Sequence, residues 1–314
     1  MLIAALLALA IAEAPVAAPA AAPEVPVSSP AKVPWAVQYD LPSKITGRTY
    51  RIYVAKPVSP PPKGGWPVVY VLDADINFPS VAAQMVMRSV SGQRAAIIVG
   101  VAYPNAIATM SLRNRDLTPS QPTPWTESVG GFPSPNAKDF GGADDFHRFM
   151  MEELRPRIAT AYPADAADQS LMGYSLGGLF ALRVLFHHPE AYRTYVVGSP
   201  SIWWNQREVL GDEAAFAAAV RAGKTAPRIL VTSDRWEQDS HSPEIPASGA
   251  ERAAALKEMD GARMVDNARE LASRLASLHG GKDYRVRYVL FPEETHLTGM
   301  PASGSRGLVF ALTP

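Results

Sequence analysis

The sequence contains no cysteine and no excess of either charge. Without cysteine, the 314-residue chain has no disulfide, no thiolate zinc site, no iron–sulfur cluster and no Cys nucleophile. Its 30 Lys and Arg residues balance its 30 Asp and Glu residues, which disfavours binding to nucleic acid or to an anionic membrane. Any chemistry must therefore rest on other side chains, and we expect no metal and no cofactor.

The first residues are apolar but too few to cross a membrane. Residues 1–12 (MLIAALLALAIA) precede an Ala-rich stretch, whereas a membrane-spanning helix needs about 20 apolar residues. Small residues after an apolar run are typical of a cleaved signal peptide, which we predict over 1–22 together with a periplasmic or secreted location. A disordered tail is the alternative, because no basic residue precedes Lys32. Residues 23–34 are predicted to be a Pro/Ala-rich linker.

Beyond Trp35 the pattern becomes globular. Short, nearly continuous apolar runs, typical of strands covered by helices on both faces, occur at 68–75, 95–103, 169–175, 194–201, 228–234 and 284–291. Between them, residues 146–162 and 268–279 repeat apolar side chains at helical spacing. This alternation predicts one α/β domain over 35–314 with a mostly parallel central sheet and helices on both faces.

The segment GYSLGG at 173–178 places a Gly-x-Ser-x-Gly motif between a predicted strand and a predicted helix. In this context the Ser backbone is strained and its hydroxyl is held at the amino end of the helix. Side chains at positions 173 and 177 are expected to collide with the neighbouring strand and helix. We interpret Ser175 as a nucleophile, with the backbone N–H of Leu176 stabilising an oxyanion. The alternative is a tight turn without chemistry.

A Ser nucleophile requires a base, and six histidines are available. His296 follows the last predicted strand, where α/β hydrolases carry the base, and it agrees with their chain order of Ser, acid and His. We predict that His296 is the base, the alternative being a solvent-exposed loop histidine. The other five lie on or at the ends of predicted helices or in a polar loop, and they are His147, His187, His188, His241 and His279.

The acid is expected after the strand at 228–234, where Asp234, Glu237 and Asp239 compete. Spacing does not decide among them. We favour Glu237, with Asp234 and a Ser-His dyad without an acid as the alternatives. A second oxyanion donor is expected from a backbone N–H after the strand at 68–72, at Ala74 or Asp75.

Several segments outside the Ser motif carry a family likeness. The most specific are RNRDLTP at 113–119 and SPSIWWN at 199–205. With them, the chain from about residue 35 onward resembles the putative-esterase family of α/β hydrolases, in the branch of the enterobactin and salmochelin trilactone esterases. The resemblance implies an α/β-hydrolase fold, with Ser175 as nucleophile, His296 as base and Glu237 near the acidic residue of the family.

The same resemblance implies two substrate-binding residues. Arg113 would meet anionic or phenolate groups near the scissile ester, the alternative being a structural ion pair with Asp116. Trp203, with Trp204, would line an acyl or aryl pocket. The alternative is that one ring packs in the core and the other covers the surface.

These observations predict an exported serine esterase that acts through an acyl-enzyme on Ser175. Its partner would be a small-molecule ester, with siderophore or related lactone esters as candidates, and it would bind no nucleic acid and insert into no membrane after signal cleavage. Acyl transfer to a sugar or alcohol on the same fold is an alternative. A non-catalytic binding module is a third hypothesis, but it predicts loss of Ser175 or His296, and both are present.

Overall fold

The structure is a computed structural model that describes residues 32–104, 109–130 and 139–313. The predicted signal peptide and most of the predicted linker lie outside the described residues. Within the described part, no helix is long and apolar enough to span a membrane.

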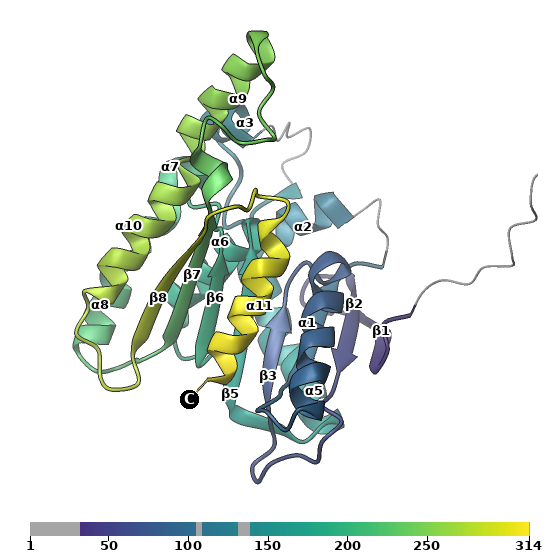
Figure 1. Cartoon of the computed structure of the whole chain (residues 1–314). Coiled ribbons are helices and arrows are strands. Elements are labelled where there is room, and N and C mark those ends of the chain that lie inside the picture. The colour runs from purple at the N-terminus through teal and green to yellow at the C-terminus, as the bar shows by residue number, and fades with distance from the viewer. Residues whose placement is uncertain (1–31, 105–108, 131–138, 314) are drawn as a thin grey trace, which may run out of the picture. The chain divides into compact units, whose positions relative to one another are not determined.

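The described residues form one eight-stranded sheet with the strand order β1-β2-β4-β3-β5-β6-β7-β8 (Figure 1). β1 and β2 pair antiparallel, as do β2 and β4, whereas all neighbours from β4 to β8 pair parallel. The predicted mostly parallel sheet is therefore confirmed. The strands are β1 (Ala36–Pro42), β2 (Thr49–Ala55), β3 (Trp66–Val71), β4 (Ile97–Ala102), β5 (Ala164–Tyr174), β6 (Thr194–Gly198), β7 (Arg228–Asp234) and β8 (Arg285–Phe291).

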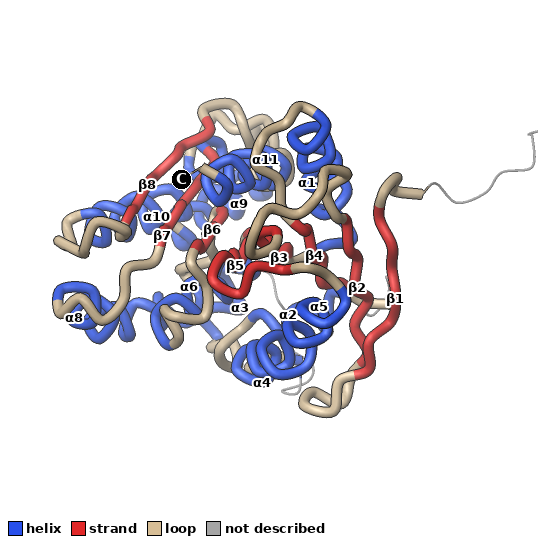
Figure 2. The backbone as a smooth tube through the Cα atoms, turned by 90° about the horizontal axis from the view of Figure 1, so that it is seen from below, coloured by secondary structure: helices blue, strands red, loops and turns tan. Residues whose placement is uncertain are grey.

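Helices cover both faces of this sheet, as predicted (Figure 2). Alternate residues of a strand point to opposite faces. Leu171 and Tyr195 therefore lie in the hydrophobic core on one face of the sheet. Val196, the next residue after Tyr195, points to the opposite face, where a Cβ on Gly307 of α11 would lie 2.7 Å from its Cγ1. The helices over one face are α1 (Ala74–Val90) and α11 (Gly299–Leu312), and those over the other include α6 (Leu176–His187) and α10 (Met264–Ala276).

The helix predicted over 146–162 is present as three consecutive pieces. A proline ring clashes with the carbonyl four residues earlier, so Pro156 favours the wider turn that precedes it. The pieces are α4 (Ala143–Arg148), the π-helix η2 (Phe149–Leu154) and α5 (Arg155–Ala161). The other elements are α2 (Thr109–Leu117), α3 (Pro124–Gly130), α7 (Trp204–Arg207), η3 (Glu208–Asp212), α8 (Glu213–Arg221), η4 (Arg235–Gln238) and α9 (Gly249–Ala262).

The parallel strands bring distant polar residues to one edge of the sheet. Ser175 directly follows β5, Ser199 follows β6, Glu237 lies just beyond β7, and His296 lies in the loop between β8 and α11. Because the carboxyl ends of parallel strands lie at the same edge, these four side chains come from loops that meet there.

Candidate active site

Ser175 occupies a sharp turn between β5 and α6, with φ 59° and ψ −120°. A Cβ on Gly173 would lie 2.0 Å from the carbonyl oxygen of Gly177, and a Cβ on Gly178 would lie 2.6 Å from a carbonyl oxygen of β6. At Gly177, where we expected an equal clash, the nearest atom is a carboxylate oxygen at 3.3 Å. The close packing that requires glycine is thus at Gly173 and Gly178, and it presents the Ser175 side chain at the amino end of α6.

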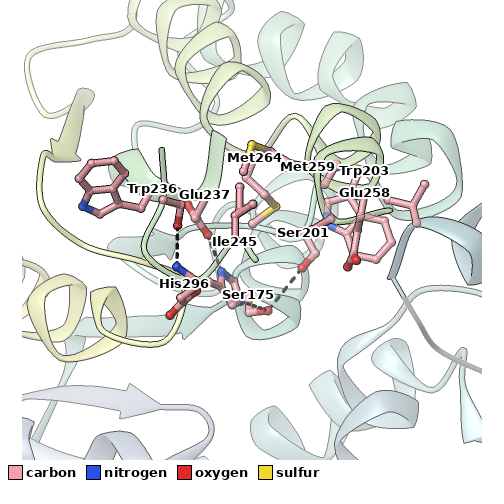
Figure 3. A pocket seen from close by; sticks show the side chains of 15 residues that line it. Ser175, Ser201, Trp203, Trp236, Glu237, Ile245, Glu258, Met259, Met264 and His296 are labelled. Carbon is pink, nitrogen blue, oxygen red and sulfur yellow. Dashed lines mark hydrogen bonds and ion pairs between the residues drawn. The ribbon is translucent and has the colours of Figure 1, made fainter. Parts of the chain in front are cut away.

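The imidazole of His296 lies between Ser175 and Glu237 (Figure 3). The Ser175 hydroxyl is 3.0 Å from Nε2, and on the other side of the ring Nδ1 donates to Oε1 of Glu237. The side chain of Glu237 is 2% exposed, whereas that of His296 is 37% exposed. The structure therefore brings together the three residues that the sequence favoured as nucleophile, base and acid.

Glu237 is held in place by groups that the sequence analysis missed. The hydroxyl of Ser199 donates to both carboxylate oxygens, and the backbone N–H of Asp234 donates to Oε2 at 3.0 Å. Ser199 itself has a positive φ of 32°, a strained conformation for a residue other than glycine. The signal that could have revealed Ser199 is its place directly after β6, at the edge where Ser175 follows β5.

The two other candidate acids do not bond to the imidazole in the structure. Asp234 is fully buried and bonds to the hydroxyl of Tyr174. Burial, followed by the nearby charge of Glu237, raises the pKa of Asp234 to about 7. Asp239 instead pairs with Arg235 and with the exposed His241.

Free backbone N–H groups lie at the amino ends of two helices next to Ser175. Leu176 is the first residue of α6, and Ala74 and Asp75 are the first two of α1, so their N–H groups have no acceptor within the helix. A carboxylate oxygen of Asp73, the residue before α1, lies 3.3 Å from where a Cβ on Gly177 would stand. The two helix ends are therefore close, and both dipoles favour negative charge there.

Arg113 pairs with Asp73 through two hydrogen bonds, Nε to Oδ1 at 2.6 Å and Nη2 to Oδ2 at 3.1 Å. The two side chains are only 13% and 7% exposed. The alternative pairing with Asp116 is wrong, because Asp116 bonds to Arg48 and to two tyrosine hydroxyls. The partner of Arg113 is thus the residue that precedes the amino end of α1.

A cavity of about 340 Å³ opens beside Ser175 and His296. One wall comes from α9, the start of α10 and the segment before α9, and its larger apolar side chains are Ile245, Met259 and Met264 (Figure 3). Two tryptophans from other elements also line the cavity, Trp203 just before α7 and Trp236 in η4. Of the tryptophan pair, Trp203 lines the cavity and Trp204 is fully buried in the core.

Besides Glu237, two carboxylates line this cavity, Glu244 and Glu258, and burial raises the pKa of Glu258. Arg113 is not among the described residues that line it. Of the two predicted substrate-binding residues, the structure therefore places Trp203 at the cavity and Arg113 beneath the neighbouring helix end.

Three features define an α/β serine hydrolase: the order of the strands in the sheet, the sharp turn at Ser175, and the alignment of the Ser175, His296 and Glu237 side chains. The chain belongs to the family described as "Putative esterase", whose model matches residues 43–286. The resemblance noted in the sequence is thereby confirmed.

The chain is similar over most of its length to siderophore esterases. It is 36% identical over 277 residues to the ferri-bacillibactin esterase BesA of Bacillus subtilis, covering 87% of this chain and 88% of that protein. It is 32% identical over 274 residues to the siderophore triacetylfusarinine C esterase of Aspergillus fumigatus, covering 83% and 88%. The crystal structure of the BES protein from Bacillus cereus superimposes with a TM-score of 0.74 at 30% identity, covering 92% of this chain and 100% of that one.

Proposed function

We propose that this serine hydrolase cleaves siderophore or related lactone esters through an acyl-enzyme on Ser175. The observation that carries the proposal is the continuous hydrogen-bonded path from Ser175 through His296 to Glu237. The similarity to relatives named as siderophore esterases supports the substrate class. The apolar and aromatic side chains that line the adjacent cavity are suited to the non-reacting part of such an ester.

In the first half of the proposed reaction, Ser175 Oγ attacks the ester carbonyl carbon while Nε2 of His296 takes the hydroxyl proton. Glu237 stabilises the resulting imidazolium through Nδ1, and the N–H groups of Leu176 and Ala74 stabilise the oxyanion. His296 then gives the proton to the leaving alcohol oxygen. In the second half, water attacks the acyl-enzyme, His296 accepts its proton and returns it to Ser175, and the carboxylic acid leaves.

Exposure of the base favours hydrolysis over acyl transfer. An acyltransferase must keep water from its acyl-enzyme, but the side chain of His296 is 37% exposed. A non-catalytic binding module would have no need for the aligned hydroxyl, imidazole and carboxylate.

The substrate class is tested with a panel of three esters: a ferric trilactone siderophore, a short neutral aryl ester and a long-chain aryl ester. Products are separated by liquid chromatography and identified by mass. We expect kcat/KM for the trilactone to exceed that for either aryl ester. A preference for the long-chain ester would instead indicate a lipase-like substrate.

Exchange of Arg113 for Met is expected to lower kcat by about tenfold, with little change in KM. The loss should be the same on the short neutral aryl ester and on an ester that carries an anionic group. The reason is that Arg113 contacts Asp73, beside the oxyanion donors, and does not line the cavity. Asp73→Asn, which removes the same ion pair from the other side, should cause a similar loss. Steady-state kinetics on both esters check this, and a loss confined to the anionic ester would restore the substrate-binding role.

We also propose that the chain is exported and that a signal peptide within about the first 23 residues is removed. The apolar start of the sequence supports this. The intact mass of protein recovered from the periplasm or the medium is expected to correspond to a chain that begins between about residues 15 and 24. Protein that stays inside the cell with Met1 retained would contradict export.

A further inference from the structure

We propose that Asp234 is a positioning residue that works as a neutral carboxylic acid, holding His296 in place through the hydroxyl of Tyr174. This inference rests on the role proposed above for His296 as the base. It gives Asp234, the last residue of β7, a function different from that of Glu237, which lies three residues further on.

The first argument is a count of protons between three oxygens. The hydroxyl of Tyr174 bonds both to Oδ2 of Asp234 and to the backbone carbonyl of His296, the latter at 2.9 Å. The phenol hydroxyl has one proton and the carbonyl has none. If Asp234 were ionised, this one proton would have to serve both the hydrogen bond to Asp234 and the hydrogen bond to the carbonyl of His296. A protonated Asp234 donates to Tyr174, which in turn donates to the carbonyl of His296. Only the neutral acid satisfies both links.

Burial and neighbouring charge favour the same protonation state. Asp234 is fully buried and Tyr174 is 2% exposed. The charged or titratable groups that face Asp234 are Glu237, Glu294, His296 and Tyr174, and the two glutamates both disfavour a further negative charge. The amino end of α11 favours a negative charge on Asp234. Burial and the charge of Glu237 outweigh this effect and raise the pKa of Asp234 to about 7. The pKa of Tyr174 is also raised by burial, so the phenol keeps its proton.

The local packing is built around this carboxyl group. A Cβ on Gly299, the first residue of α11, would lie 2.1 Å from Oδ1 of Asp234, so only glycine leaves room for the acid. The network thus joins the end of β7, the residue before Ser175, and the loop that carries His296. Ionisation of Asp234 removes one proton from the network, and the carbonyl of His296 then competes with a carboxylate for the proton of Tyr174. We therefore expect the base to lose its fixed position as pH rises through neutrality.

The test compares pH profiles of kcat on an activated aryl ester for the wild type, Asp234→Asn and Tyr174→Phe. In the wild type, kcat should fall above neutral pH. Asn cannot ionise but can donate to Tyr174, so Asp234→Asn should keep kcat within about threefold of the wild type at pH 6 and lose the decline at higher pH. Tyr174→Phe has no hydroxyl, so it should give a kcat that is lower by about tenfold at pH 6 and does not decline above neutral pH.

An infrared difference spectrum measures the proton without turnover. The difference between the wild type and Asp234→Asn at pH 6 should contain a buried carboxylic-acid C=O band that disappears at high pH, whereas the contribution of the buried Asp116, whose pKa burial raises to about 6, is common to both proteins. A wild type without this band, or an Asp234→Asn variant with the same alkaline decline in kcat, would overturn the inference. A wild type that hydrolyses no ester would contradict the proposed function instead, and the infrared band alone would then decide the protonation state.

Discussion

Replacement of Ser175 with Ala is expected to abolish covalent labelling by a fluorophosphonate and to lower kcat by about 10³-fold or more. The reason is that the hydroxyl 3.0 Å from Nε2 of His296 is the only described serine hydroxyl bonded to that nitrogen. Without it no acyl-enzyme forms, and only the oxyanion donors and substrate binding can accelerate the reaction. The thermal midpoint should change little, because removing this hydroxyl leaves the turn geometry intact.

Ser201 provides a matched control for this experiment. Its hydroxyl lies 3.5 Å from that of Ser175 and lines the same cavity, but the structure gives it no bond to His296. Ser201→Ala should therefore still be labelled at one site, which peptide mapping should locate at Ser175. Labelling that survives in Ser175→Ala and disappears in Ser201→Ala would transfer the role of nucleophile to Ser201.

Exchange of Glu237 for Gln is expected to lower kcat/KM by about 10²-fold or more on one activated ester. Gln keeps the shape of the side chain but removes the charge that stabilises the imidazolium formed as Ser175 attacks. Because its amide can present N–H to Nδ1, it also disturbs the tautomer that leaves Nε2 free to accept a proton.

Asp234→Asn, measured at pH 6, is the control for this second exchange because it alters the other carboxyl group near the same loop. It should stay within a few-fold of the wild type. If Asp234→Asn fell by 10²-fold and Glu237→Gln did not, the acid would be Asp234. If neither variant lost activity, the site would work as a Ser-His dyad.

Local sequence was sufficient for the fold and for two of the site residues. The alternation of apolar runs with helical segments determines a mostly parallel sheet, because each strand must bury both faces under helices. Ser175 could be selected because its strained turn needs glycines at nearby positions along the same chain. His296 could be selected because chain order places it after the final strand. The choice of Ser175 depends on neighbours in sequence, whereas the fold and His296 depend on the order of segments along the chain.

Contacts between separate loops were decided only by the tertiary structure. Spacing could not separate Glu237 from Asp234, because the choice depends on how the loop after β8 brings the imidazole to the end of β7. For the same reason the partner of Arg113 was Asp73, 40 residues away, rather than Asp116 on the same helix. A hydrogen bond across strands is set by side-chain direction and burial, which only the packed sheet determines. The sequence by itself thus determined the fold, Ser175 and His296, whereas the packed sheet decided the contacts of Glu237, Arg113, Ser199 and Tyr174.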